Sequence, residues 1–427
     1  MVPDAEPGAQ LGQADGYHHR SLIRRLILAF ATASLAWGAS EAAAGPGTPP
    51  LDLTAKLGAA LHAKGIAPYQ TGAFAVDLVT GKVVFAHNSA VGFVPASNEK
   101  LPVTYAALKV LGPRFRFPTE VRGQGSLGAG GTWNGNIVLK GYGDPTLTTT
   151  RLAGLVRRVR AAGIRRVTGM VIGDESFFDK TRTAPGWKAS FYIEESPPLS
   201  ALVVDRAWTG KRYTTTPAYT AADDFRRMLV KAGVRVAGKT RSFRAGGKLL
   251  AVSLSEPLEE ILHDVDAHSD NFSAELLLKE LGAVAGTGGT TTAGAAVVIG
   301  VLAQNGIPTT GLAIADGSGL SSLDRLTPQA IVAILQQCWR DAGLRSSLVQ
   351  AMAVAGRSGT LRNRLVGPTT RGSVVGKTGT TDLASVLSGF VHGRYAFSVI
   401  QNGSPVPSWT ARPAQDRFVQ LLAAASP

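Results

Sequence analysis

The sequence predicts an α+β fold, in which a mixed domain of helices and sheet is interrupted by a smaller α/β domain. Helical patterns near the start of the chain and again from Asp266 are followed by apolar strands at the end. Between about residues 115 and 262, short strand-like runs alternate with helical ones instead. A chain of 427 residues, 44% of them hydrophobic, is long enough to bury two cores.

The first elements are a helix, a hairpin and a second helix. Residues 51–64 have helical spacing, and residues 72–87 alternate apolar and polar side chains around a Thr-Gly-Lys turn, which is typical of a β-hairpin. A helix is expected from Ser97 to Leu111, where a Gly-Pro pair ends it. Pro102 lies early in that helix, so we expect a slight kink or a relaxed helix start.

The middle of the chain supplies the elements of the inserted α/β domain, which we assign to residues 116–262. Strands are expected at residues 121–124, 135–140, 167–173, 235–238 and 249–255, and helices at residues 152–162 and 221–233.

The last part of the chain returns to helices and ends in strands. Helices are expected at residues 271–281, 291–305, 327–342 and 413–425, and strands at residues 374–377, 384–392 and 395–401. Residues 45–115 and 263–427 together then form the mixed domain, an antiparallel sheet flanked by helices.

Residues 1–44 have the three parts of a secretory signal peptide. Three arginines precede an apolar run from Leu26 to Trp37, and a small-residue cleavage site follows at Ala44. The alternative is an uncleaved membrane anchor, for which the apolar run is too short to span a bilayer comfortably. We therefore expect a secreted protein, associated with the cell wall or periplasm.

The net charge of +14 indicates attraction to anionic partners. The basic residues are scattered and form no nucleic-acid-binding motif, so nucleic acid is not an expected partner. A secreted protein meets anionic wall polymers and membrane surfaces first, and this charge would attract the protein to them.

Three short motifs occur in order: Ser97-Asn98-Glu99-Lys100, Ser269-Asp270-Asn271 and Lys377-Thr378-Gly379-Thr380. They have the forms S-x-x-K, S-x-N and K-T-G. Residues three apart on a helix share one face, so the Ser97 hydroxyl and the Lys100 amine can meet. A serine becomes a nucleophile when a base takes its proton, and burial can make a lysine that base. A capping serine beside a surface lysine would give the same pattern.

The second motif offers polar groups opposite the nucleophile. Ser269 can relay a proton toward a leaving amine, and Asn271 can donate to an amide carbonyl. The alternative is structural, because Ser269 or Asp270 would cap the helix that follows.

The third motif lies on a predicted strand. Lys377 and Thr378 offer a cation and a hydroxyl to a terminal carboxylate. Gly379 lets a substrate backbone approach the strand edge. The backbone N–H groups of Thr380 and Ser97 can form an oxyanion hole. The alternative is an edge-strand lysine followed by a turn, but chance does not readily place all three motifs in this order.

Other catalytic and cofactor sites are not predicted. His268, Ser269 and Asp270 are adjacent and point apart, so they cannot form a triad, and no G-x-S-x-G elbow exists. His263 and His268 are five residues apart, which does not match one helical face, so no metal site is expected. No P-loop or dinucleotide fingerprint is present, so no cofactor is expected.

With these motifs, the chain resembles the DacB-type, class-C low-molecular-mass penicillin-binding proteins. The resemblance extends over most of the chain from about Leu51 to Asn402. Its segments are Pro95–Leu101, Gly141–Leu147, Ser200–Arg206, Asp316–Ser321 and Ser358–Leu361.

This resemblance implies a β-lactamase/transpeptidase-like fold for the mixed domain. It implies serine-type D-Ala-D-Ala carboxypeptidase activity, often with endopeptidase activity, on peptidoglycan stem peptides ending in D-Ala-D-Ala, and acylation by β-lactam antibiotics. The implied roles are Ser97 as nucleophile, Lys100 as base, Ser269 and Asn271 as the second-motif pair, Lys377, Thr378 and Thr380 as carboxylate and oxyanion groups, and Asp144 as an inserted-domain acid that assists substrate recognition. The segment between Ser97 and Ser269 is shorter than in larger members, so one of their two inserted domains is expected to be missing.

Two alternatives remain. One is a catalytically weak penicillin-binding wall protein that kept the fold. The other is a β-lactamase, which needs a group to drive deacylation, and neither Glu99 nor Glu175 is obviously placed for that.

Overall fold

The structure is a computed structural model that describes residues 51–426. The predicted signal peptide at residues 1–44 lies outside the described residues. The described residues all belong to one compact unit. Within the described part of the chain, no helix is long and apolar enough to cross a membrane.

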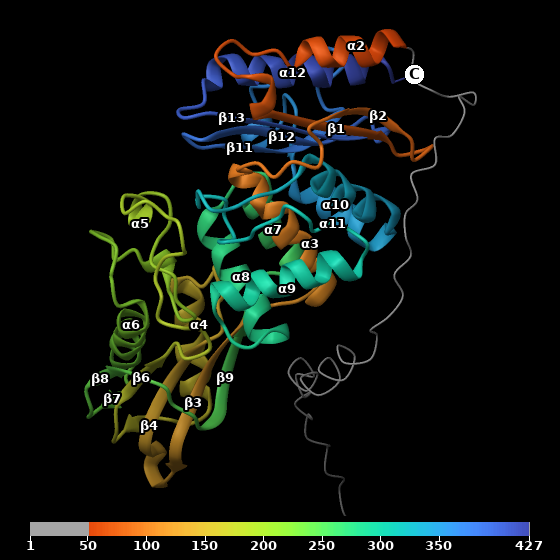
Figure 1. The fold of residues 1–427 in the computed structure, drawn as a ribbon. Coiled ribbons are helices and arrows are strands. Elements are labelled where there is room, and N and C mark those ends of the chain that lie inside the picture. The colour runs from red at the N-terminus through yellow and green to blue at the C-terminus, as the bar shows by residue number, and fades with distance from the viewer. Residues whose placement is uncertain (1–50, 427) are drawn as a thin grey trace, which may run out of the picture. The chain divides into compact units, whose positions relative to one another are not determined.

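The first sheet has six strands in the order β10-β11-β12-β13-β1-β2, and all neighbouring pairs are antiparallel (Figure 1). Its strands are β1 (Thr71–Asp77), β2 (Val83–His87), β10 (Ala353–Val354), β11 (Val374–Thr380), β12 (Ala384–Val391) and β13 (Tyr395–Asn402). Because β1 pairs with β13, the N-terminal hairpin extends a sheet that the C-terminal strands begin. The predicted hairpin and C-terminal strands are therefore present, and they share one sheet.

Helices cover both faces of this sheet (Figure 1). α2 (Leu51–Ala60) and α12 (Ser408–Ala424) pack on one face; α3 (Lys100–Val110), α7 (Leu258–Asp266), α8 (Asn271–Ala285), α9 (Thr291–Gln304), α10 (Pro328–Arg340) and α11 (Ala342–Ala351) lie on the other side. β13 shows why: Phe397 and Val399 pack in the core with α2 and α12, whereas Ala396 and Ile400 pack in the core with α3 and α10. Side chains alternate along a strand, so a sheet covered twice needs apolar residues at successive positions.

A second, seven-stranded sheet is formed by residues 118–254. Its strands are β3 (Pro118–Leu127), β4 (Thr132–Gly141), β5 (Arg166–Val167), β6 (Val171–Asp174), β7 (Arg235–Val236), β8 (Thr240–Ser242) and β9 (Lys248–Leu254). β3 pairs antiparallel with β4 and β9, and the remaining pairs are parallel. α4 (Thr149–Ala161) and α6 (Pro217–Lys231) pack on it through a hydrophobic core of their own.

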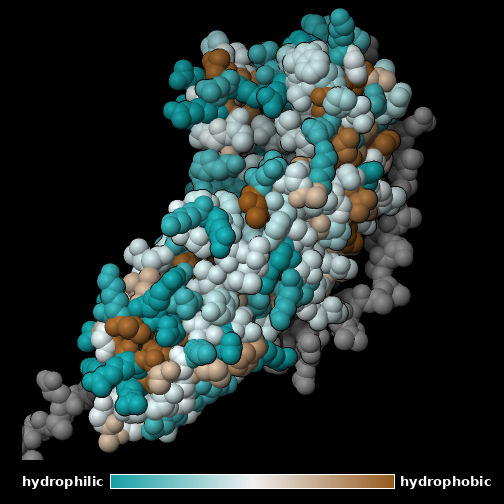
Figure 2. All heavy atoms as spheres, turned by 90° about the vertical axis from the view of Figure 1, so that its left-hand side faces the viewer, coloured by the Kyte–Doolittle hydropathy of each residue, from teal (hydrophilic) through white to brown (hydrophobic). Residues whose placement is uncertain are grey.

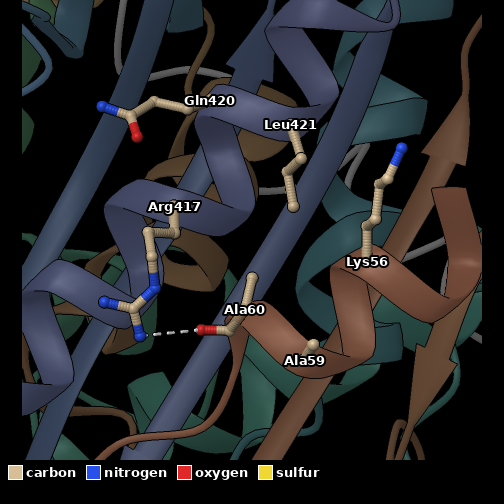
Figure 3. Close-up of a pocket in the computed structure, with 6 residues that line it drawn as sticks. All are labelled: Lys56, Ala59, Ala60, Arg417, Gln420 and Leu421. Carbon is tan, nitrogen blue, oxygen red and sulfur yellow. Dashed lines mark hydrogen bonds between the residues drawn. The ribbon is translucent and has the colours of Figure 1, made fainter.

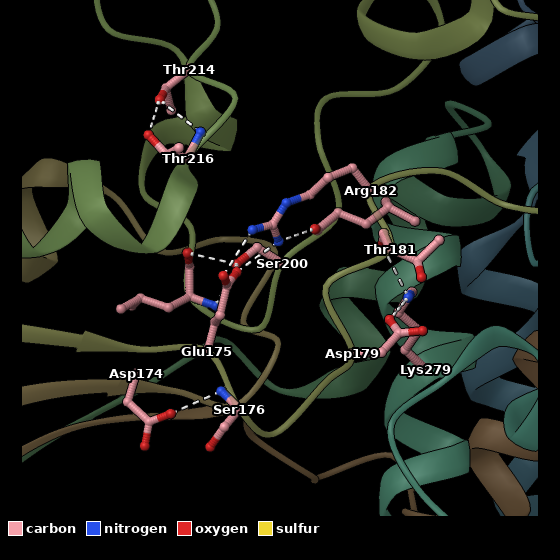
Figure 4. Close-up of polar contacts among 12 residues, drawn as sticks. Asp174, Glu175, Ser176, Asp179, Thr181, Arg182, Ser200, Thr214, Thr216 and Lys279 are labelled. Carbon is pink, nitrogen blue, oxygen red and sulfur yellow. Dashed lines mark hydrogen bonds and ion pairs between the residues drawn. The ribbon is translucent and has the colours of Figure 1, made fainter. Parts of the chain in front are cut away.

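The segment 116–262 also shares side-chain contacts with α8. Phe178 and Leu199 pack in one cluster with Phe272 and Leu276 of that helix. Figure 4 shows a polar contact beside it, where buried Lys279 of α8 pairs with Asp179 and donates to the Thr181 carbonyl at 3.2 Å. A separate inserted domain with limits at 116 and 262 stays a prediction, since this segment has both its own sheet and a core joined to α8.

Several predicted element limits were wrong. The strand expected at 167–173 is two short strands, β5 and β6, and α7 and α11 were not predicted. α12 begins at Ser408 rather than at Pro413, which lies inside the helix. Its first turn is held from outside, because the Thr410 hydroxyl donates to the Lys64 carbonyl at 2.8 Å.

Candidate active site

Ser97 lies in a short 3-10 turn, Ala96–Glu99, that leads directly into α3. The relaxed helix start expected from Pro102 is therefore present, with the regular helix beginning at Lys100. Lys100 Nζ lies 3.1 Å from Ser97 Oγ, so the predicted meeting of hydroxyl and amine is observed. The same amine donates to Asn271 Oδ1 at 2.8 Å and to the Ser318 carbonyl at 2.5 Å.

Lys100 is fully buried, and burial lowers its pKa to about 8. Nearby carboxyl groups oppose this shift by stabilising the ammonium form; they are Asp316, Glu275, Asp270 and Asp266. An amine with this pKa is partly neutral near physiological pH, and a neutral amine can take a proton from a hydroxyl.

The second motif meets the first through Asn271 and the third through Ser269. Lys377 Nζ donates to Ser269 Oγ at 2.9 Å. Asn271 accepts from Lys100 on one side and donates from Nδ2 to the Glu195 carbonyl at 3.1 Å on the other. Ser269 has a left-handed backbone, φ 64°, which is strained for a serine and recurs at functional sites.

The alternative capping role does not fit Ser269. The N-cap residue of α8 is Asp270, and no side-chain oxygen caps the helix there. Asp270 instead forms an ion pair with Arg206. The Ser269 hydroxyl is therefore left for the contact with Lys377.

β11 runs beside the nucleophile turn. The Asn98 amide donates to the Lys377 carbonyl at 3.2 Å, which ties the strand to the turn. A Cβ on Gly379 would lie 3.0 Å from both Pro95 O and Ser97 N. Gly379 thus permits close approach of the turn that carries Ser97, and the expected approach of a substrate backbone stays a prediction.

These elements enclose a cavity of about 610 Å³. Its lining contains Ser97, Glu195, Ser269, Asn271, Leu320, Thr360, Asn363, Arg364, Thr378, Gly379, Thr380, Thr381 and Arg412. Residues of all three motifs therefore line one cavity. Lys100 and Lys377 are buried and are not among the lining residues. A second hollow, between α2 and α12, is lined by Lys56, Ala59, Ala60, Arg417, Gln420 and Leu421 and contains none of the motif residues (Figure 3).

Lys377 is not among the residues that line the cavity, and its expected contact with a carboxylate stays a prediction. Its side chain is fully buried, and its amine donates to Ser269 Oγ and to the Thr378 carbonyl, each at 2.9 Å. Burial, reinforced by the charge of Lys100, holds the pKa of Lys377 well below the usual lysine value.

Asp144 is not brought into this cavity. It follows β4, is 2% exposed, pairs with Arg151 at 3.0 Å and accepts from Thr146. Burial outweighs these partners and raises its pKa. A recognition role for Asp144 stays a prediction.

Sequence reasoning missed several groups of the site. The Ser318 carbonyl and Thr360 lie in segments that resemble the family, but they were given no role. Glu195 and Arg412 carry no local sequence signal, because their positions depend on how distant segments pack.

Neither glutamate considered for a β-lactamase lines the cavity. Glu99 is fully buried, and burial holds its pKa well above the usual value. Glu175 is bound by Arg182 at 2.6 and 2.8 Å and by the Ser200 hydroxyl at 2.5 Å (Figure 4).

His263 and His268 lie close together in the structure, although they are five residues apart in the sequence. One ligand atom each from His263, Asp264 and His268 lies within 4.8 Å of the others. α7 ends at Asp266, and the turn that follows brings His268 back beside the helix. Asp264 and His268 already bond to each other, at 3.0 Å.

Comparison with known proteins adds independent information. The model of the D-Ala-D-Ala carboxypeptidase 3 (S13) family matches residues 53–215 and 209–425. The chain is 30% identical to a D-alanyl-D-alanine carboxypeptidase of Actinomadura sp. (strain R39), over 83% of this chain and 81% of that protein. It is also 30% identical to carboxypeptidase DacB of Mycolicibacterium smegmatis, over 89% and 88% of the two chains.

Among solved structures, the fold is similar to penicillin-binding protein 4 (dacB) from Haemophilus influenzae. The TM-score is 0.76 at 23% identity, covering 87% of this chain and 98% of that one. The predicted α+β, transpeptidase-like fold is thereby confirmed.

Proposed function

Because the chain belongs to the D-Ala-D-Ala carboxypeptidase 3 (S13) family, we propose that its cavity releases the terminal D-alanine of peptidoglycan stem peptides through an acyl-enzyme on Ser97. The family makes the protein a serine-type carboxypeptidase of the penicillin-binding type. The observation that supports the residue assignment is the position of Lys100, whose buried amine touches Ser97 and Asn271 beside the cavity.

The geometry supports the following acylation step. Neutral Lys100 takes the proton of the Ser97 hydroxyl as Ser97 Oγ attacks the carbonyl carbon of the penultimate D-alanine. The backbone N–H groups of Ser97 and Thr380 stabilise the oxyanion; losing one such donor typically costs about 10²–10³ in rate. Asn271 orients Lys100 and, through its position on the cavity wall, the substrate amide.

The leaving group is then protonated and the acyl-enzyme is hydrolysed. The proton that Lys100 took from Ser97 is relayed through Ser269 to the departing D-alanine nitrogen as the C–N bond breaks, which leaves Lys100 neutral again. Lys377 donates to Ser269 Oγ and orients it for this relay. Water then attacks the ester, the neutral Lys100 amine takes a proton from the water, and that proton passes to Ser97 Oγ as the ester bond breaks. A β-lactam acylates Ser97 by the same route, and its ring-opened leaving group stays attached.

The substrate and the signal-like N-terminus support a site of action outside the cytoplasm, in the periplasm or cell wall. The positive net charge supports additional association with anionic wall polymers or membrane surfaces.

The proposal is tested by labelling the protein with a fluorescent penicillin and mapping the adduct by mass spectrometry. We expect one adduct, on the peptide that contains Ser97, and none in the Ser97→Ala variant. D-alanine release from a diacyl-Lys-D-Ala-D-Ala peptide is measured in parallel.

The three candidate functions give different results. An adduct elsewhere, or none, contradicts the role of Ser97. An adduct on Ser97 without D-alanine release supports the weak penicillin-binding protein, and sustained penicillin turnover supports the β-lactamase.

A further inference from the structure

A substrate that ends in D-alanine brings a carboxylate into the cavity, and that charge needs a partner. The scissile peptide bond is one residue from the C-terminus, so the carboxylate lies close to the β11 side of the site. Lys377 is poorly placed to meet it, because its amine is buried and already donates to Ser269 Oγ and the Thr378 carbonyl. Hydroxyl groups of Thr378 and Thr380 alone would leave a desolvated anion without a countercharge.

Among the described residues, two arginines line the cavity, and one of them is already paired with an acidic side chain. Arg364 pairs with Asp416 at 2.6 Å and also donates to Gln415 Oε1 at 3.2 Å. Its side chain is only 16% exposed, so this pairing fixes it in the wall. Arg364 therefore has little freedom to bind a ligand.

Arg412 differs in its partners and in its exposure. It lies on α12, it is exposed, and among the described residues it forms no ion pair with an acidic side chain. Its guanidinium donates to Thr380 Oγ1 at 3.3 Å, a long contact that a stronger acceptor would readily replace. The positive charge of Arg412 thus lies at the β11 end of the cavity, beside the third motif.

The only acidic residue in the cavity lining of the described chain is Glu195, and it lies on the Asn271 side. The two sides of the cavity therefore differ in charge. A bound peptide would have its carboxylate toward Arg412 and its acyl portion toward Asn271 and Glu195. This polarity matches the direction that attack by Ser97 requires.

From this geometry we infer that Arg412 is the specificity residue that binds the carboxylate next to the scissile bond, together with the hydroxyls of Thr378 and Thr380. This inference deepens the proposed function and rests on it. A guanidinium offers two parallel N–H donors to a carboxylate, which gives both charge and direction. The ligand class is a peptide, or a β-lactam, with a free carboxylate on the carbon that carries the leaving nitrogen.

The test compares two substrates and three variants. The substrates are diacyl-Lys-D-Ala-D-Ala and the same peptide with a C-terminal amide. For the acid substrate, Arg412→Gln is expected to raise KM about 10- to 100-fold, the size of lost charge-assisted hydrogen bonds, with a small change in kcat. For the amide, wild type and Arg412→Gln are expected to be equally poor, and Arg412→Lys is expected to recover part of the loss with the acid.

The matched control is Arg362→Ala, which removes one positive charge from an exposed residue that does not line the cavity. It is expected to leave the KM of the acid substrate unchanged. Penicillin labelling at saturating concentration and the melting temperature show that each variant is folded.

The possible outcomes distinguish a failure of the proposed carboxypeptidase function from a failure of the inference about Arg412. A wild-type protein that releases no D-alanine contradicts the proposed function. An active wild type with an unchanged acid-to-amide preference in Arg412→Gln overturns the inference alone. Equal losses for both substrates would assign Arg412 a structural role and would overturn it as well.

Discussion

Two buried lysines at this site have different contacts, which fits the different roles proposed for them. Lys100 contacts Ser97, the proposed nucleophile, whereas Lys377 contacts Ser269, the proposed proton relay. Burial lowers the pKa of both amines, and the charge of Lys100 lowers that of Lys377 further. Two neighbouring positive charges repel, so protonation of one amine disfavours protonation of the other.

The first prediction concerns the pH dependence of acylation. Lys100 acts as base only when neutral, and its pKa is about 8. The second-order rate of penicillin acylation should therefore rise about tenfold per pH unit below pH 7 and level off above about pH 8.5. Stopped-flow labelling between pH 5.5 and 9.5 measures this rate.

A Lys100→Arg variant serves as the control for this profile. A guanidinium stays protonated throughout this range, so the variant should lose most activity and the rising limb with it. A wild-type rate that is flat or that falls with pH would rule out Lys100 as the base.

The second prediction concerns Gly379. In Gly379→Ala the new Cβ lies 3.0 Å from Pro95 O and Ser97 N, so the nucleophile turn must move by a few tenths of an ångström. We expect acylation to slow about tenfold, since small misplacements of reacting groups are costly, while the melting temperature changes little. The control is Gly300→Ala in α9, where nothing lies within 4 Å of the new Cβ.

At the residue scale, the sequence predicted the contacts between neighbouring residues of the site. It did not predict which site residues are buried. Helical spacing is enough to place Ser97 beside Lys100. The burial of Lys377 and the use of Gly379 depend on how β11 packs against a turn some 280 positions earlier, which no local pattern records.

At the scale of elements, a strained turn attaches the middle segment to the catalytic helix. Asp205, Arg206 and Ala207 all have left-handed backbones, φ 47°, 54° and 65°. This conformation lets Arg206 pair with Asp270 at the start of α8 and lie 5.1 Å from the Phe272 ring. The pair thus holds the backbone between Ser269 and Asn271.

The third prediction is a coupling between Arg206 and Asp270. In a double-mutant cycle with Arg206→Ala and Asp270→Asn, we expect an interaction energy of about 0.5–1 kcal/mol, because the arginine is partly exposed. Urea unfolding of the four proteins measures it. The exposed pair Asp52–Lys56 on α2 provides a reference, and its coupling should be smaller. An equal interaction energy in the two pairs would contradict the idea that Arg206 and Asp270 hold the backbone at the start of α8.

Sequence patterns predicted whether a segment is a helix or a strand more reliably than they predicted which strands pair with each other. The hairpin at 71–87 and the strands at 384–402 follow from alternation and apolar runs, but their pairing through β1 and β13 joins segments over 300 residues apart. The two-residue strands β5 and β7 are too short to show a period. α12 begins before Pro413 because outside contacts hold its first turn.

At the scale of the whole molecule, the core shared between the middle segment and α8 predicts joint unfolding. Phe178 is 4% exposed and packs with Phe272 and Leu276. Phe178→Ala should cost about 3–5 kcal/mol and lower one common melting transition, followed both by calorimetry and by loss of penicillin binding. Tyr219→Ala, at a half-exposed position on α6, is the control and should cost little. Two separate transitions, with penicillin binding unaffected, would instead show an independent inserted domain.

The last prediction follows from the net charge of +14. Hydrophilic side chains cover much of the face shown in Figure 2, with apolar patches that are small and separate, so attraction to a wall surface would be mainly electrostatic. The Debye length falls from about 30 Å at 0.01 M salt to about 8 Å at 0.15 M. Release of D-alanine from intact peptidoglycan that carries anionic polymers should therefore fall over this range, whereas release from the short diacyl peptide should change much less. Sacculi stripped of their anionic polymers provide the control and should behave like the peptide. If salt slows all three substrates equally, the charge acts inside the cavity, on the substrate carboxylate, and not over the protein surface.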